Sequence, residues 1–334
     1  MPLLSVEKLS IDFLMRGSWL PAVSDVSFSL AKGEVLALVG ESGCGKSVTC
    51  LSLAKLLPEP PARYASGSIL LEDKGKTSDV LKLHPRELRK IRGGRIAYIF
   101  QEPSVSLNPV FRIGEQIAEA IELHRPELED IRGEVVALLR QVGISEPERR
   151  VDAYPHEMSG GMQQRVMIAM ALACKPEILV ADEPTTALDV TIQAQILDLL
   201  RKLRSETEMA IILVTHNLGL VADLADRVIV MYAGHMVESA PVEKLLSSPL
   251  HPYTQALLSA VPKLGQDTEK LTTIPGQVPS PANYPRGCRF YGRCARAEAL
   301  PEKDQKICAE EPQAWREASP GHGCRCWQLH GEKS

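Results

Sequence analysis

A single glycine-rich stretch constrains this chain more than any other part of its sequence. Residues 40–47 read Gly-Glu-Ser-Gly-Cys-Gly-Lys-Ser, after an apolar run at 35–39 and before a helix-like segment at 48–57. This order and the G-x-x-x-x-G-K-S spacing are typical of a phosphate-binding loop, in which glycines let successive backbone N–H groups face one anion. Lys46 would then reach the outer phosphates of a nucleotide, and Ser47 would bind Mg²⁺. A chance glycine-rich turn is the alternative.

The composition is that of an ordinary soluble globular protein. The 334 residues are 44% hydrophobic and 24% charged, which suits one large or two modest domains. A net charge of −4 without a basic run argues against nucleic acid as the main partner. No apolar run is long enough to cross a bilayer, and residues 1–10 lack the features of a signal peptide, so we expect the chain in the cytosol.

Hydrophobic periodicity predicts additions on both sides of the phosphate loop. Alternating residues at 4–13 and 22–30 predict an antiparallel sheet before the loop. After a strand at 95–100, apolar residues recur at helical spacing in 113–123 and 131–142. These segments predict a helical subdomain inserted into an α/β core.

The core is expected to resume as a parallel sheet. Helices at 162–174 and 192–203 alternate with buried strands at 178–181 and 211–214, and this alternation indicates parallel strands. Residues 227–237 then predict a closing hairpin with its turn at Ala233-Gly234. Prolines and polar residues dominate the later part of the chain, so we expect a domain boundary near residue 245.

Acidic residues end one of the buried strands. Asp182 and Glu183 follow the strand at 178–181, where Asp182 can hold Mg²⁺ and Glu183 can act as general base on an attacking water. Paired acids after a strand are common by chance, and the phosphate loop upstream strengthens this interpretation. His216 ends the next strand, where its imidazole would contact a terminal phosphate, although a strand-end histidine is more often structural.

A further motif carries a family resemblance. Residues 158–165 read Met-Ser-Gly-Gly-Met-Gln-Gln-Arg, a serine and glycines that open a helix and make an anion site. This motif resembles the signature sequence of the ATP-binding subunits of ABC transporters. In that family the signature of one subunit closes over the ATP held by the phosphate loop of a second subunit, so the resemblance implies two cassettes that work together.

The resemblance implies a role for each matching position. The resemblance implies an ABC ATPase fold with a RecA-like parallel-sheet core. It also implies that residues 187–189 form the D-loop. Phe13 corresponds to the aromatic residue that stacks on adenine, with Trp19 as a rival. The other ATP-binding positions are Gly40, Glu41, Ser42, Gly43, Cys44, Gly45, Lys46, Ser47, Val48 and Gln101. The partner's ATP would contact Ser159, Gly160, Gly161, Met162, Gln163 and Asp189. Mg²⁺ would be held through Ser47, Gln101 and Asp182, with Glu183 and His216 as the catalytic residues.

The tail narrows the resemblance. Residues 251–258, His-Pro-Tyr-Thr-Gln-Ala-Leu-Leu, followed by Val-Pro at 261–262, resemble the C-terminal extension of the oligopeptide/dipeptide importers, a subfamily that also serves opines and nickel. We therefore expect a nucleotide-binding domain at 1–245, with its helical subdomain at about 102–165, and a small Cys-rich extension at 246–334.

Five of the eight cysteines crowd the last 47 residues. In a reducing compartment an odd number of thiols are poor disulfide candidates, so metal is the better interpretation. The resemblance implies a [4Fe–4S] cluster on Cys288, Cys294, Cys308 and Cys326, with Cys324 as the competitor for the fourth position. Structural Zn²⁺ and reduced, unligated thiols remain the alternatives to this cluster. Four thiolates suit Zn²⁺ as well as an iron–sulfur cluster, so the ligand type does not decide between the two metals. We expect loss of the Cys288 thiol to destabilise the tail and to leave nucleotide binding by the isolated chain intact.

The resemblance implies an energy-coupling ATPase of a peptide importer. ATP and Mg²⁺ would be its cofactors. Its partners would be a second ATPase subunit, more often a different chain than a copy, two transmembrane permeases and an extracytoplasmic binding protein. It would lie peripherally on the cytoplasmic side of the inner membrane. The alternatives are a soluble ABC ATPase without a membrane partner and a regulatory nucleotide binder. A soluble ABC ATPase would usually carry a coiled coil or a duplicated cassette, and this chain has neither.

Overall fold

The computed structural model describes residues 2–185, 189–260 and 274–329. Its contacts divide the chain into two compact units. The phosphate-loop unit comprises Pro2–Leu30, Val35–Leu81 and Thr215–Ser334, and the signature unit comprises Ala31–Glu34 and Lys82–Val214. Four of the positions singled out in the sequence, D-loop residues 187–188 and tail residues 261–262, lie outside the described residues.

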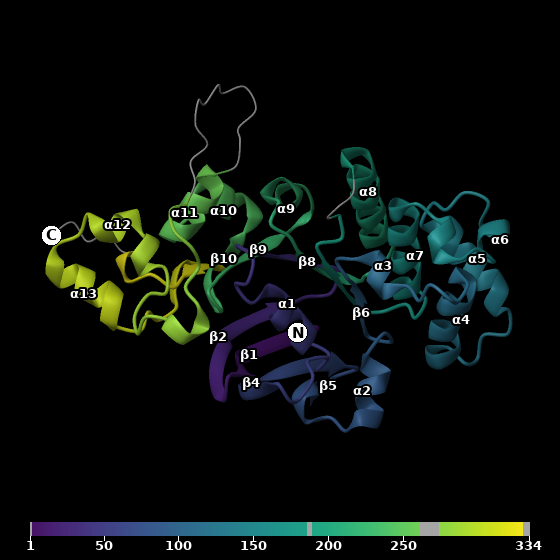
Figure 1. The fold of residues 1–334 in the computed structure, drawn as a ribbon, viewed down its shortest axis with the longest axis horizontal. Coiled ribbons are helices and arrows are strands. Elements are labelled where there is room, and N and C mark those ends of the chain that lie inside the picture. The colour runs from purple at the N-terminus through teal and green to yellow at the C-terminus, as the bar shows by residue number, and fades with distance from the viewer. Residues whose placement is uncertain (1, 186–188, 261–273, 330–334) are drawn as a thin grey trace. The chain divides into compact units, whose positions relative to one another are not determined.

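An antiparallel sheet forms the N-terminal part of the phosphate-loop unit (Figure 1). Its order is β2-β1-β4-β5, and a turn with positive φ at Arg16 and Gly17 joins its first two strands. The strands are β1 (Leu4–Met15), β2 (Ser18–Leu30), β4 (Ala62–Asp73) and β5 (Lys76–Asp79). The predicted antiparallel sheet is confirmed, and β4 and β5 extend it by two strands that periodicity did not predict.

A second set of strands in this unit carries the phosphate loop. The order is β11-β12-β10-β9-β3, in which β3 and β9 are parallel and β9 and β10 form the predicted hairpin. Positive φ at Ala233 and Gly234 closes its turn. The strands are β3 (Val35–Val39), β9 (Arg227–Tyr232), β10 (His235–Pro241), β11 (Arg316–Ser319) and β12 (His322–Cys324). The last strands of the chain thus share a sheet with the strand that precedes the phosphate loop.

The helix after the phosphate loop differs from the predicted segment 48–57. Helix α1 covers Lys46–Ser52, because Gly45 starts it with φ 103° and Lys55 adopts a left-handed φ of 51° beyond its end. The other helices of the unit are α9 (Leu218–Leu224), α10 (Val242–Ser247), α11 (Pro252–Ser259), α12 (Ala295–Glu298) and α13 (Glu302–Glu310).

The signature unit contains a parallel sheet and a group of helices. The strands have the order β8-β7-β6, and nearly every strand residue is buried, as in a sheet covered on both faces. They are β6 (Ile96–Ile99), β7 (Ile178–Asp182) and β8 (Ala210–Val214). Helices α4, α5 and α6 gather beside α7, as predicted for an inserted helical part (Figure 1). The helices are α2 (Pro85–Ile91), α3 (Pro103–Ser106), α4 (Ile113–His124), α5 (Ile131–Gln141), α6 (Pro147–Arg150), α7 (Gly160–Leu172) and α8 (Val190–Glu206).

A buried carboxylate joins the segments of the C-terminal region. Glu238 of β10 has no exposed surface. Its Oε1 accepts the N–H of Leu250 at 2.8 Å and lies 2.9 Å from Nε2 of His322, while its Oε2 accepts the N–H of His251 at 2.8 Å. Strands β10 and β12 and the start of α11 therefore meet at one side chain.

We predict that Glu238→Ala lowers the free energy of unfolding by about 3 kcal/mol, because two buried N–H groups and an imidazole lose their acceptor. The matched control is Glu243→Ala, an exposed acid on α10, which should change it by less than about 0.5 kcal/mol. Urea unfolding followed by circular dichroism measures both. Equal destabilisation by the two variants would contradict the anchoring role.

Candidate functional site

The phosphate loop has a backbone that only glycine permits. Gly40 has φ 150°, and a Cβ there would lie 2.2 Å from the carbonyl oxygen of Met231 and 2.8 Å from Sγ of Cys44. Gly45 has φ 103°, with the carbonyl oxygen of Ala22 only 3.1 Å from a Cβ position. A side chain at Gly40 would therefore force the loop away from β9.

Lys46 lies inside the curve of this loop. Its side chain is buried, and its Nζ donates hydrogen bonds to the carbonyl oxygens of Gly40 at 2.8 Å and Glu41 at 3.1 Å. The loop thus concentrates positive charge where its glycines bend the backbone.

The residues around Lys46 complete the loop. Helix α1 begins at Lys46 without a side-chain cap, which leaves its first N–H groups to an anion or to water. Ser42, Gly43 and Ser47 are exposed, and Val48 is half-buried. Burial raises the pKa of the Cys44 thiol despite the nearby Lys46, so this cysteine is a packing residue.

The acidic residues lie at the carboxyl edge of the parallel strands. Asp182 is the last residue of β7, and Glu183 follows with a left-handed φ of 48°. The N–H of Glu183 donates to the carbonyl oxygen of Val214 at 2.9 Å. Nε2 of Gln101, from the end of the neighbouring β6, donates to Oε2 of Glu183 at 3.2 Å. The structure therefore brings together the glutamine and the general-base candidate, which stand 82 positions apart.

The signature motif caps a helix. Oγ of Ser159 accepts the N–H of Met162 at 3.4 Å at the start of α7, while Nε2 of Gln163 donates to the carbonyl oxygen of Pro155 at 2.8 Å. Ser159 and Gly160 are exposed, and a Cβ at Gly160 would meet nothing within 4 Å. An open N-terminus on a helix of 13 residues suits an anion that arrives from outside the chain.

Three further candidates are exposed or half-buried. Asp189 caps α8 by accepting the N–H of Ile192 at 2.9 Å. His216 is exposed in the segment that precedes α9. Phe13 is half-buried in β1, whereas its rival Trp19 is 38% exposed and has the guanidinium of Arg63 stacked 4.2 Å from its ring centroid. Both aromatic residues stay candidates for the adenine contact.

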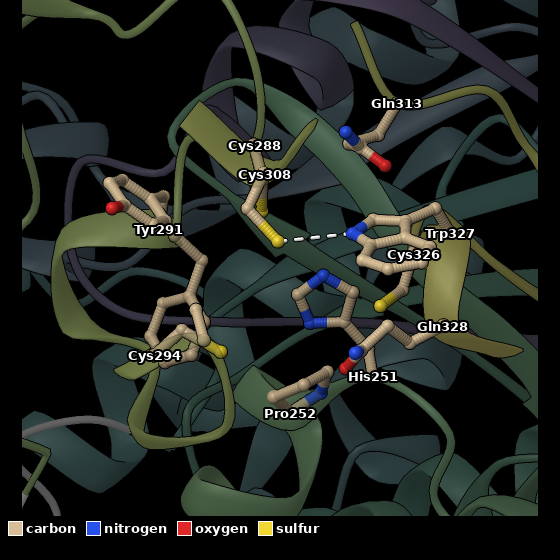
Figure 2. A pocket seen from close by; sticks show the side chains of 12 residues that line it. His251, Pro252, Cys288, Tyr291, Cys294, Cys308, Gln313, Cys326, Trp327 and Gln328 are labelled. Atoms are coloured by element: carbon tan, nitrogen blue, oxygen red, sulfur yellow. Dashed lines mark hydrogen bonds between the residues drawn. The ribbon is translucent and has the colours of Figure 1, made fainter. Parts of the chain in front are cut away.

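Four of the tail cysteines surround one small cavity (Figure 2). Cys288, Cys294, Cys308 and Cys326 all line it, whereas Cys324, which is buried in β12, is not one of its lining residues. The cavity has a volume of about 20 Å³, and burial raises the pKa of Cys288 to about 12. In the described part of the chain, no group of three or more His, Cys, Asp or Glu side chains has the arrangement of a metal site.

Two residues that sequence reasoning did not assign to the cysteine cluster share the cavity. Nε1 of Trp327 donates to Sγ of Cys308 at 3.0 Å. The imidazole of His251 lies among the cysteines (Figure 2), and its Nδ1 accepts the N–H of Tyr253 at 3.1 Å. Burial lowers the pKa of His251 to about 3, so the ring is neutral with its proton on Nε2. The only signal for His251 in the sequence was its position in residues 251–258, the stretch that resembles the C-terminal extension of the oligopeptide/dipeptide importers.

None of the helices in the described residues combines the length and apolarity needed to cross a bilayer.

Comparison with known proteins agrees with these features. The ABC transporter family model matches residues 23–186, and the model for the C-terminal region of oligopeptide/dipeptide transporters matches residues 237–300. A protein of Brucella abortus (strain 2308) named "Putative peptide import ATP-binding protein" is 52% identical over 307 residues, covering 92% of this chain and 91% of its own. A protein of Brucella ovis with the same description is 49% identical over 98% of both chains.

Solved structures show the same fold. An ATP-binding cassette described as a dimer in a post-hydrolysis state, bound to ADP and Pi, is 27% identical with a TM-score of 0.63, over 72% of this chain and 98% of its own. Part of an ABC transporter complex of Clostridium perfringens is also 27% identical, with a TM-score of 0.62, over 74% and 91% of the two chains. The chain therefore belongs to the family of ATP-binding, ATP-hydrolysing subunits of ABC transporters, with a C-terminal region of the oligopeptide/dipeptide type.

Proposed function

We propose that this chain is the energy-coupling ATPase of a bacterial importer for dipeptides or oligopeptides. The observation that carries the proposal is the match of residues 237–300 to the C-terminal region of oligopeptide/dipeptide transporters, on the same chain as the ABC transporter match. The Brucella relatives, aligned over nearly the whole chain and named for peptide import, support it. Opines and nickel are the alternative cargoes.

In this proposal, residues 40–48 hold the phosphates of ATP, with Phe13 beside the adenine. Lys46 exchanges the carbonyl oxygens of Gly40 and Glu41 for phosphate oxygens, which are stronger partners for an ammonium group. Ser47, Asp182 and Gln101 would hold Mg²⁺, which prefers oxygen ligands, and the bound ion would supply charge that offsets that of the phosphates.

Hydrolysis depends on the residues at the strand ends. Glu183 accepts a proton from the attacking water, and the hydrogen bond from Gln101 orients its carboxylate before the nucleotide binds. His216 contacts the γ-phosphate. The open helix end of residues 159–163, together with Asp189, contacts the ATP of a second cassette, so binding closes a dimer and hydrolysis reopens it.

The proposed assembly rests on the family matches. The chain pairs with a second, different ATPase subunit and docks on two transmembrane permeases at the cytoplasmic side of the inner membrane, with an extracytoplasmic binding protein delivering the cargo. The dimeric solved cassette supports the pairing of two nucleotide domains. We assign the nucleotide-binding domain to 1–245, its helical subdomain to about 102–165 and the extension to 246–334.

The cysteine cavity is the proposed metal centre. The support for it is the donor type, because Cys288, Cys294, Cys308 and Cys326 line one cavity and the competing Cys324 does not, whereas side chains of the described residues do not have the arrangement of a metal site. Burial raises the pKa of Cys288 to about 12, so a thiolate there would need a nearby cation to stabilise it. Four thiolates suit a [4Fe–4S] cluster or Zn²⁺, and we propose the cluster. When bound, such a centre would crosslink the segments that carry the cysteines.

We predict that Lys46→Ala weakens ATP binding at least about 100-fold, because the loop loses its phosphate-binding ammonium. Glu183→Gln should retain ATP binding, and the assembled complex should hydrolyse ATP at least about 100-fold more slowly. A fluorescent ATP analogue reports binding, and phosphate release reports hydrolysis. The exposed Lys32→Ala is the control and should match wild type. Equal loss of binding in Lys46→Ala and Glu183→Gln would contradict the role of Glu183.

For the metal centre, we predict about four iron and four acid-labile sulfide per chain in protein purified without oxygen. Cys326→Ser should lose most of the iron, whereas Cys324→Ser should keep it, because of these two cysteines Cys326 alone lines the cavity. Zinc in place of iron would contradict the cluster and keep the four-cysteine site. Equal metal content in the two variants would contradict the choice of ligand.

The importer can be distinguished from a soluble ABC ATPase in detergent extracts. We predict that the tagged chain recovers hydrophobic permease subunits and a second ATPase. In proteoliposomes, a binding protein loaded with dipeptide or oligopeptide should stimulate hydrolysis, which empty binding protein should not. Recovery of no membrane subunit would favour the soluble alternative, and stimulation by nickel or an opine alone would change the cargo.

A further inference from the structure

An acidic side chain lies within the loop proposed to bind ATP. Glu41 directly follows Gly40, and its carbonyl oxygen accepts the ammonium of Lys46 at 3.1 Å. ATP is a polyanion, and an unpaired carboxylate in such a loop would repel it and compete for the lysine. The affinity of this loop for ATP therefore depends on what neutralises Glu41.

The C-terminal region supplies the neutralising group. The guanidinium of Arg293 forms two parallel hydrogen bonds with the carboxylate of Glu41, NH1 to Oε2 at 2.7 Å and NH2 to Oε1 at 3.0 Å. The arginine side chain is only 6% exposed, compared with 30% for the glutamate. Bidentate pairing of this kind is strong and directional, and limited access to water reduces its screening.

Arg293 is itself held in place. Its Nε donates to the carbonyl oxygen of Pro275 at 2.7 Å, and its NH1 also donates to Oη of Tyr232 at 3.3 Å. Tyr232 packs against Tyr253 and Phe290, with ring centroids 4.6 and 5.2 Å away. This packing fixes the direction from which the guanidinium approaches the loop.

A second contact holds the backbone of the same loop residue. The N–H of Glu41 donates to Oη of Tyr253 at 2.9 Å. Tyr253 is fully buried, and burial raises the pKa of its phenol, so it acts as a neutral acceptor. The main chain and the side chain of Glu41 are thus both bound by residues of the C-terminal region, and the carboxylate is turned toward Arg293.

We propose that Arg293 is a positioning residue for nucleotide binding, which neutralises and orients Glu41 so that the C-terminal region sets the affinity of the phosphate loop for ATP. The inference rests on the proposed ATP-binding function of this loop. Arg293 also directly precedes Cys294, which lines the cysteine cavity. The residue that pairs with Glu41 and a residue of that cavity therefore lie in one short segment. If the C-terminal region only packed against the nucleotide-binding domain, it would not need to place the guanidinium of Arg293 on the carboxylate of Glu41.

The test is a charge cycle on the full-length chain, read by titration with a fluorescent ATP analogue. Arg293→Gln, which keeps much of the side-chain volume, should weaken ATP binding at least about tenfold. The double variant Glu41→Gln/Arg293→Gln should bind ATP at least about threefold more tightly than Arg293→Gln, because the unpaired carboxylate is gone. The defect of Arg293→Gln should shrink as salt rises, as expected for repulsion.

Two further variants make the test specific. Arg293→Lys keeps the charge and should bind ATP more tightly than Arg293→Gln, and it replaces that variant if the latter does not fold by circular dichroism. Arg296→Gln removes an exposed cation three residues away and should leave the affinity unchanged.

The outcomes separate this inference from the function on which it rests. A folded Arg293→Gln chain that binds ATP within about twofold of wild type would overturn it, as would a double variant no tighter than Arg293→Gln. A wild-type chain that binds no ATP would overturn the proposed function as well.

Discussion

The close approach of the phosphate loop to strand β9 is the constraint on which the site depends. A Cβ at Gly40 would lie 2.2 Å from the carbonyl oxygen of Met231, so the loop fits only with glycine at that position. The N–H of Gly234 donates a hydrogen bond to the carbonyl oxygen of Cys44 at 2.9 Å, which connects the β9–β10 turn to the same loop. The sheet therefore shapes the loop before any ligand arrives, and this lowers the entropy cost of binding.

The sequence predicted best what is encoded locally. The loop at 40–47 and the helices at 113–124 and 131–141 follow from short-range spacing, and the structure has them within one or two residues. Helix α1 was predicted too late and too long, because the apolar residues after Ser52 continue a helical pattern that the left-handed Lys55 ends. Strand β4 was missed because its residues 64–68 lack an alternating apolar pattern, and β5 was missed because its four residues, Lys-Thr-Ser-Asp, include no apolar one.

Contacts between distant residues escaped prediction. No sequence pattern links Glu41 with Arg293, which lie 252 positions apart, so their contact was not predicted. The structure groups the tail with the phosphate loop in one compact unit. The choice of Cys326 over Cys324 rested on a resemblance and stays a prediction, to which the structure adds that Cys326 lines the cavity and Cys324 does not.

The distance along the chain between Glu41 and its partner has a consequence for biosynthesis. At about 5–20 residues per second, the ribosome needs roughly 10–50 s to translate the 252 positions between them. Throughout that interval the nascent chain carries the phosphate loop without Arg293, the cation that pairs with the Glu41 carboxylate. If Arg293 positions Glu41 as we propose, the nucleotide site is completed late in translation, and a chain interrupted before residue 293 would leave the ribosome with a loop poorly suited to hold ATP.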